Sequence, residues 1–139
     1  MLAVDGNGLP LGLLIASASP AEIRLADETL RNIRVPRRRG RPRQKPVRVI
    51  ADRAYDSDPF REQLADRGIE LVCPHRRGRV RPKTQDGRRL RRYKRRWKIE
   101  RTNAWLFAFR RLVVRYEVIP ALYHAFLCFA CALIVLRWL

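Results

Sequence analysis

The sequence predicts an α/β protein in which a small mixed sheet is flanked by helices. Short β-prone segments alternate with segments that carry helix-capping signals, and this alternation is typical of mixed helix and sheet architectures. The chain then ends in two long stretches of helical pattern separated by Pro120. A chain of 139 residues, of which 47% are hydrophobic, has enough material for one core. We therefore expect residues 1–139 to fold as a single unit.

The first expected element is a β-hairpin within residues 2–15. Two apolar runs, Leu2–Val4 and Leu9–Ile15, flank the sequence Asp-Gly-Asn-Gly at positions 5–8. Glycine and asparagine tolerate the positive backbone angles of tight turns, so the pattern is typical of two antiparallel strands joined by a turn.

A helix and then a basic loop are expected next. Residues 19–22 read Ser-Pro-Ala-Glu, which combines a capping box with proline at the first helical position. The helix should run to about Asn32. Residues 36–46 are rich in proline, arginine and glycine and are expected to form a basic linker without regular structure.

The middle of the chain predicts two strands with a helix between them. Val47–Ala51 (VRVIA) is a candidate for a short buried strand that ends at Asp52. The sequence Ser-Asp-Pro at positions 57–59 supplies a cap, which we assign to Asp58, and a first-turn proline. Gly68 should close this helix, and residues 69–73 (IELVC) should form the next strand.

The last third of the chain is expected to be a loop followed by helices. Residues 74–92 are polar and basic and contain proline and glycine, which predicts a second basic loop. The C-terminal helices should occupy residues 93–139, the first from about Tyr93 to Tyr116 and the last from residue 121. The longest apolar run, Ala125–Leu136, is shorter than the roughly 20 residues of a membrane span, so a buried helix is expected there.

The charge of the chain indicates a polyanionic partner. Lys and Arg number 31 against 13 Asp and Glu, a net charge of +18. The excess lies in two blocks, Arg37–Arg48 and Arg76–Arg101. Nucleic acid is the expected partner, and an anionic membrane surface is the alternative. No secretory signal is visible at the N-terminus, which favours a cytoplasmic protein with free thiols.

One carboxylate stands alone in the most basic segment. Residues 88–101 read RRLRRYKRRWKIER, and Glu100 is the only acid among them. A surface ion pair is one interpretation. A metal ligand beside phosphate-binding arginines is the other. On a regular helix, Tyr93, Arg96, Glu100 and Phe107 would lie within an arc of about 60°.

Two segments resemble DDE-type transposases of bacterial insertion sequences. Tyr93-x2-Arg96-x3-Glu100, continued by RTNAWLFAFRRL at 101–112, resembles the signature around the last acidic residue of that family. The sequence VIADRAYDS at 49–57 is similar to the strand that carries the second acidic residue. The resemblance extends over nearly the whole chain.

The resemblance implies a ribonuclease H-like fold, here incomplete at the N-terminus. In that fold three carboxylates hold two divalent metal ions, Mg²⁺ or Mn²⁺, for DNA cleavage and strand transfer during transposition. Asp52 and Glu100 would be two catalytic residues and metal ligands. The first aspartate of the family lies on a strand before the hairpin, and Asp5 is better explained as a turn residue. We therefore expect either that an upstream polypeptide completes the two-metal site, or that the chain is a noncatalytic, basic DNA-binding remnant.

The resemblance also implies DNA contacts, on transposon ends and on target DNA. The expected DNA-binding residues are Tyr93, Arg96, Arg101, Arg110, Arg111, Arg39 and Arg41. The family has a lysine at the position of Phe107, and we expect Arg111 to replace it because it would lie on the same helical arc. Transposition further implies a homo-oligomer that holds two DNA ends, associated with the bacterial nucleoid.

Two smaller motifs leave alternatives open. The sequence RRRGRPR at 37–43 resembles an AT-hook, whose core inserts into the narrow minor groove of A·T-rich DNA. Nonspecific contact with phosphates is the alternative. His124, Cys128 and Cys131, with Cys73 and His75, have the residue types of a zinc site, but a cysteine in an apolar helix usually behaves as a small hydrophobic residue.

Overall fold

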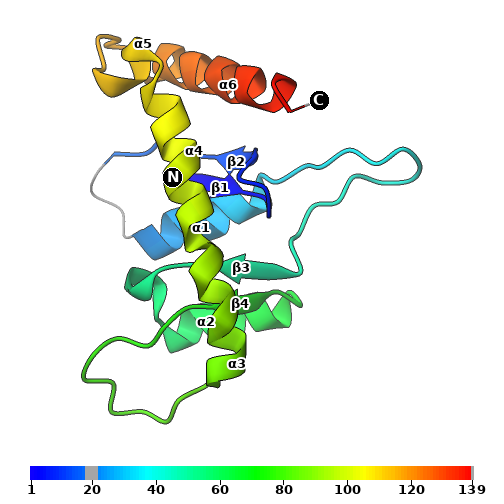
Figure 1. Cartoon of the computed structure of the whole chain (residues 1–139), viewed down its shortest axis with the longest axis vertical. Helices are drawn as coiled ribbons and strands as arrows, with labels where there is room; N and C mark the ends of the chain where they lie inside the picture. Colours follow the sequence, from blue (N-terminus) through cyan, green and yellow to red (C-terminus); the bar gives the residue numbers. More distant parts are fainter. Residues whose placement is uncertain (18–21, 139) are drawn as a thin grey trace.

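The computed structural model describes residues 1–17 and 22–138 (Figure 1). Helices and short strands alternate along this part of the chain, so the predicted α/β class is confirmed. The expected capping residues 19–21 lie outside the described residues. The helix that they should begin is present as α1 (Glu22–Arg31).

The predicted hairpin is confirmed. Strands β1 (Leu2–Val4) and β2 (Pro10–Leu13) pair in antiparallel orientation. The carboxylate of Asp5 accepts hydrogen bonds from the backbone N–H groups of Asn7 at 2.7 Å and Leu9 at 2.8 Å, so this side chain belongs to the turn. Gly8 has a φ of +85°, an angle that a glycine adopts at little cost.

The middle of the chain forms a parallel strand pair joined by a helix. Strands β3 (Arg48–Ile50) and β4 (Glu70–Val72) are parallel, and η1 (Arg53–Tyr55) and α2 (Asp58–Asp66) connect them. Gly68, with a φ of +69°, follows α2 as predicted. The assignment of the cap was wrong, because Ser57 holds the capping position and Asp58 is the first helical residue.

The predicted single mixed sheet is not formed by the described strands. They make two separate sheets, β1 with β2 and β3 with β4. No strand in residues 1–17 and 22–138 hydrogen-bonds to the second edge of β1 or of β3, so nothing links the two pairs into one sheet. The ribonuclease H-like sheet therefore remains an expectation.

The C-terminal region is more broken than the sequence predicted. The second basic loop ends at Asp86, whose carboxylate accepts from two backbone N–H groups and starts α3 (Gly87–Leu90), which leads into η2 (Arg91–Arg96). The predicted helix 93–116 is divided into the end of η2, α4 (Trp97–Phe107) and α5 (Arg110–Val113), because Phe109 is extended. Helix α6 (Pro120–Leu136) begins at the predicted proline.

The helices α3, η2 and α4 follow one another along the long axis of the molecule, in front of both sheets (Figure 1). Segment η2 contacts β3, and α4 contacts β1. One apolar cluster lies among α1, α2 and β4, and a second lies among α4, α5 and α6. The β1–β2 hairpin packs against both clusters. Ala3 and Leu11 contact the first cluster, and Leu2, Leu9 and Leu13 contact the second.

The longest described helix, α6, is too short to span a bilayer, and no other helix in the described ranges has the length and hydrophobicity to do so.

Candidate functional site

Asp52 is positioned by both parallel strands. It directly follows the strand β3 and Ala51, and its Oδ1 accepts a hydrogen bond from the Ala54 backbone N–H at 2.8 Å, which caps η1. The thiol of buried Cys73, just after β4, donates to the Asp52 carbonyl oxygen at 2.8 Å. The side chain is half-buried. Burial, with smaller contributions from the charges of Glu22 and Asp52, raises the pKa of Tyr55 to about 12.

Glu100 lies in the first turn of α4 and is exposed, with 57% of its side chain accessible. The guanidinium of Arg96 donates to Glu100 Oε1 and lies 5.9 Å from the ring centre of Tyr93. The predicted grouping of these three residues is therefore present, although Tyr93 and Arg96 belong to the 3-10 segment η2 rather than to α4. Arg96 and Glu100 also form the surface ion pair that was one of the two interpretations of this carboxylate.

Segment η2 connects the regions that carry the two carboxylates. Strand β3, which ends two residues before Asp52, contacts η2, and η2 continues into the helix of Glu100. Within residues 1–17 and 22–138 there is no group of three or more His, Cys, Asp or Glu side chains placed to hold a metal ion. The assignment of Asp52 and Glu100 as metal ligands stays a prediction.

The zinc alternative finds no support in the described part of the chain, where no such group exists. His124 and Cys128 are 3.8 Å apart on α6, measured from Nε2 to Sγ. Cys73 and Cys131 are buried, and burial raises the pKa of each thiol to about 11. A cysteine binds a metal ion as the thiolate, and the raised pKa of each buried thiol disfavours that form.

Arg101 has a structural role that the sequence did not reveal. Its guanidinium lies between the rings of Trp97 and Trp105, at 4.9 Å and 4.6 Å from their centres, and donates to the Asn7 carbonyl in the hairpin turn. Thr102 also donates to the turn, at the carbonyl of Gly8 (2.5 Å). These contacts fasten the hairpin to α4. The predicted DNA contact of Arg101 remains a prediction.

Arg110 and Arg111 lie on α5 and line an open cavity of about 500 Å³. Arg111 is paired with Glu117 at 3.1 Å and lies over the ring of Phe126. The predicted helical arc shared by Glu100 and Arg111 was wrong, because α4 ends at Phe107. The role of Arg111 in replacing the expected lysine stays a prediction.

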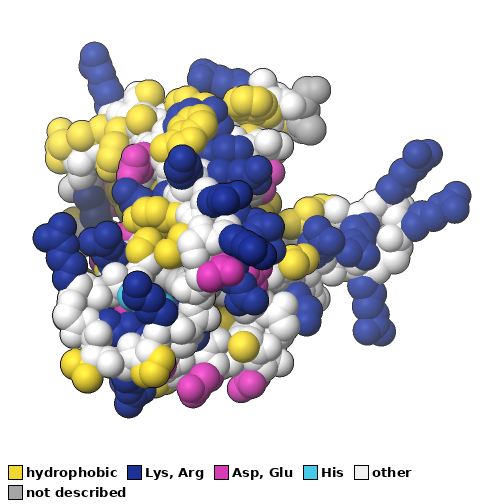
Figure 2. Space-filling view, turned by 60° about the horizontal axis from the view of Figure 1, so that its bottom comes forward, with side chains coloured by type: hydrophobic (Ala, Val, Ile, Leu, Met, Phe, Trp, Pro, Cys, Tyr) yellow, Lys and Arg dark blue, Asp and Glu magenta, His cyan; other side chains and the backbone are white. Residues whose placement is uncertain are grey.

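Arg39 and Arg41 lie in a projecting hairpin, residues 35–43, which we call the arm. Val35 and Arg43 close it with two backbone hydrogen bonds of 2.9 Å and 2.8 Å. The arm extends away from the body of the molecule (Figure 1), and its basic side chains point outward on several sides (Figure 2). Residues 36–43 are all exposed.

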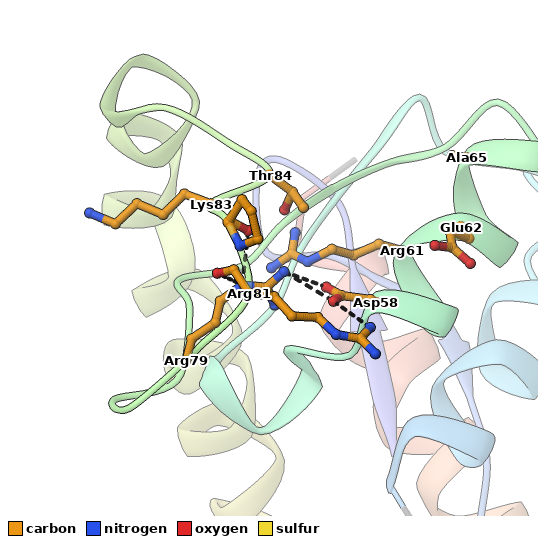
Figure 3. Close-up of a pocket in the computed structure, with 9 residues that line it drawn as sticks. Asp58, Arg61, Glu62, Ala65, Arg79, Arg81, Lys83 and Thr84 are labelled. Carbon is orange, nitrogen blue, oxygen red and sulfur yellow. Dashed lines mark hydrogen bonds and ion pairs between the residues drawn. The ribbon is translucent and has the colours of Figure 1, made fainter.

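The second basic loop, by contrast, is held against the start of α2. Asp58 binds Arg79 at 2.8 Å and Arg81 at 3.2 Å, on the wall of an open pocket of about 400 Å³ (Figure 3). Asp56 accepts from Arg61 at 2.8 Å and from the His75 ring at 3.0 Å. The sequence analysis left both aspartates outside the site. Asp56 and Asp58 hold residues about 20 positions away, so no local sequence pattern predicts these contacts.

Fold and charge together define a basic α/β protein with arginine-rich helical segments. The family described as "Transposase DDE domain" matches residues 1–135, and the chain belongs to this family. The resemblance noted in the sequence is thereby confirmed. The family generally uses a divalent metal ion, and its partner is DNA.

A curated relative gives the same assignment. A protein of Burkholderia cepacia, named as a transposase for insertion sequence element IS402, is 40% identical over 139 residues. The match covers 96% of this chain and 60% of the relative, so the chain spans about three fifths of the length of that protein. No solved structure matches the chain.

Proposed function

We propose that the chain is the C-terminal part of the catalytic domain of an insertion-sequence transposase. In the complete protein this domain binds DNA and performs metal-dependent cleavage and strand transfer. The family match over residues 1–135 carries the proposal, and the net charge of +18 agrees with a DNA partner.

Asp52 and Glu100 are the proposed metal ligands. Carboxylate oxygens are the ligands that Mg²⁺ and Mn²⁺ prefer. Strand β3, which precedes Asp52, contacts η2, which leads into the helix of Glu100, and this contact supports the proposal. When bound, the metal ions would activate the attacking oxygen and stabilise the leaving oxygen of a phosphodiester. Arg96 donates to Glu100 Oε1 and lies over the ring of Tyr93, so Glu100 Oε2 would be the oxygen that binds a metal ion.

The third carboxylate is proposed to come from residues outside this chain. The described residues provide no third acidic ligand, and the curated relative is longer than the aligned region. Both β1 and β3 have an edge without a strand partner in the described ranges. Unpaired backbone groups at such an edge accept an added strand. A strand that carries the missing aspartate, from the same or a separate polypeptide, would complete the site there.

The proposed DNA surface comprises the arm and the helices beside Glu100. It includes Tyr93, Arg96, Arg101, Arg110 and Arg111, with Arg39 and Arg41 on the arm. Transposition joins two DNA ends to a target, so we further propose a homo-oligomer assembled on DNA in the bacterial cytoplasm.

A cleavage assay tests the enzymatic proposal. The chain is combined with the segment of the IS402 relative that lies outside the alignment, and with donor DNA and Mg²⁺. We expect strand cleavage that is lost in Asp52→Asn and Glu100→Gln but kept in Asp66→Asn, a matched change at an exposed carboxylate of α2. Cleavage that persists in both acidic-site variants would refute the assignment of the ligands.

Metal binding by the chain alone gives a readout that does not need activity. Fe²⁺ replaces Mg²⁺ and, with ascorbate and peroxide, cuts the backbone near its site. We expect cuts close to residues 52 and 100, both suppressed by Asp52→Asn. Cuts at only one of these segments, or scattered cuts, would show that the two carboxylates do not share an ion.

A noncatalytic DNA-binding protein is the second candidate. The ion pair between Glu100 and Arg96 favours it, since this carboxylate already has a cationic partner. The cleavage assay distinguishes the two candidates. If the chain binds DNA with full affinity but no combination of chain, added segment and Mg²⁺ cleaves it, the noncatalytic function is supported.

A further inference from the structure

The guanidinium groups of the arm (residues 35–43) project from the body of the molecule without partners in the described structure. Several arginines of the body bind carboxylates instead, as in the pairs Arg48–Glu70, Arg61–Asp56 and Arg79–Asp58. Within the described parts of the chain, five arm side chains make no hydrogen bond, ion pair or aromatic contact; these are Arg37, Arg38, Arg39, Arg41 and Arg43. They are available to an anion outside the chain.

The root of the arm is anchored while its tip is not. The guanidinium of Arg34 donates to the carbonyl oxygens of Arg31 and Ile33 at the end of α1. On the other side, Lys45 donates to the Arg67 carbonyl at 2.8 Å, after α2. With the Val35–Arg43 bridge between these anchors, the arm leaves the body of the molecule at a defined place.

No bulky side chain lies between the two arginines at the tip. Gly40 separates Arg39 from Arg41, has a φ of +85°, and has no heavy atom within 4 Å of the position a Cβ would take. Proline at positions 36 and 42 adds rings but no long side chains. The backbone at Gly40 can therefore approach DNA closely while the arginines on either side of it reach into a groove about 6 Å wide.

The residue types of the tip also limit what it can recognise. Residues 36–43 contain only arginine, glycine and proline, so the tip has no asparagine or glutamine to bind adenine in the major groove. Arginine is attracted instead to narrow minor grooves, where A·T-rich sequence strengthens the negative potential. Lysine, which is more strongly hydrated, enters such grooves less readily.

We propose that the arm enters the minor groove of A·T-rich DNA through Arg39, Gly40 and Arg41, and so gives the protein a preference for such sites. The inference rests on the proposed DNA-binding function and deepens it by naming the class of DNA. Contact with phosphates alone is the competing interpretation, and it predicts no dependence on base composition.

The test measures binding of the whole chain to two labelled duplexes of equal length, one with a central A·T tract and one with G·C in its place. We expect about tenfold tighter binding to the A·T duplex, within the discrimination that groove contacts provide. In the double variant Arg39→Lys/Arg41→Lys, which keeps the charge, the preference should fall below about twofold because binding to the A·T duplex weakens. The matched variant Arg37→Lys/Arg38→Lys should keep the preference, because these residues lie outside the Arg-Gly-Arg centre.

Competition with netropsin, a small molecule that fills the A·T minor groove, provides the second readout. It should weaken binding of the wild-type protein to the A·T duplex and leave the lysine variant at positions 39 and 41 unaffected. Equal, salt-sensitive binding to both duplexes would overturn the inference while leaving DNA binding intact. A preference that survives the change at 39 and 41 would also overturn it. Absence of binding to either duplex would overturn the proposed function itself.

Discussion

The arm (residues 35–43) and the second basic loop (residues 74–86) have similar compositions and different contacts. In the loop, Arg79 is 13% exposed and paired with Asp58, and Arg76 donates to the carbonyl oxygens of Arg53 and Ala54. The arm has no acidic neighbour among its described contacts. The difference lies in what each segment meets, because the start of α2 presents carboxylates to the loop. Basic composition alone therefore does not identify a DNA-binding surface.

Asp56 is the centre of the contacts that hold the loop. Its side chain is 3% exposed and accepts from Arg61, from His75 and from the Arg76 backbone N–H. The Thr84 backbone N–H donates to His75 Nε2 at 3.2 Å, which fits a neutral ring with its proton on Nδ1, facing Asp56. Burial by itself would raise the pKa of Asp56, but these hydrogen bonds outweigh it and lower the pKa to about 2.

The largest effect is expected from removing the charge of the arm. Replacing its five arginines by glutamine (positions 37, 38, 39, 41 and 43) should reduce DNA affinity about 100-fold near 0.1 M salt. The slope of log K against log salt should become less steep by up to about 4. Each phosphate contact that is lost reduces the number of counterions released when the protein binds DNA. The thermal midpoint should change by less than about 2 °C, since these side chains contact nothing in the described structure. Unchanged affinity would assign DNA binding to another surface.

Asp56→Asn should have the next largest effect, and it should act on folding. We expect the free energy of unfolding at pH 7 to fall by about 2 kcal/mol, measured in urea. The folded pKa of about 2 lies below the ordinary 3.8, so the stabilisation is complete above about pH 4 and is lost as the pH falls through 2. The difference between wild type and variant should therefore shrink over this range.

The control for that experiment is Asp66→Asn, at the exposed carboxylate of the last residue of α2. This variant should lose less than about 0.5 kcal/mol at any pH. A loss equal to that of Asp56→Asn would show that the loop contacts do not account for the effect.

A pair of single changes sharpens the contrast between the two regions. Arg79→Gln should lower the free energy of unfolding by about 1 kcal/mol and leave DNA affinity within about twofold. Arg39→Gln should leave stability unchanged and weaken DNA binding roughly fivefold at 0.1 M salt. Thermal melts and anisotropy titrations on both proteins measure the two quantities. The reverse result would mean that the loop binds DNA and the arm does not.

The smallest effect is expected for Arg81→Gln. Arg81 also pairs with Asp58, but its side chain is 74% exposed, and solvent screens such pairs. A loss below about 0.5 kcal/mol in the same urea experiment is expected. A loss equal to that of Arg79→Gln would show that burial does not set the strength of these pairs.

Local signals predicted the elements well. The turn at residues 5–8, the glycine that follows α2 and the proline that begins α6 each act through neighbouring residues, and each element appears where expected. The errors involve more distant partners. A single mixed sheet was expected from the order of strands and helices, but joining the two pairs requires a strand that hydrogen-bonds to both, and no described strand does so. The unbroken helix was expected from periodicity, which did not foresee the extended Phe109.

In the candidate site, too, the local contacts were predicted and the distant ones were not. Motifs predicted Asp52, Glu100 and the contact of Arg96 with Glu100, because four positions along a helical segment bring side chains together. The partners of Arg101 and of Asp56 were not predicted. These contacts join residues 94 and 19–20 positions apart, which the fold alone makes neighbours.

By itself, then, the sequence determined the order of elements, the family and the cationic character, since these depend on composition and short-range pattern. Tertiary structure decided which arginines remain free. An arginine near a buried carboxylate is held by it, while one on a projecting hairpin meets only solvent. That distinction depends on distances between segments far apart in the chain, and it separates the arm from the loop.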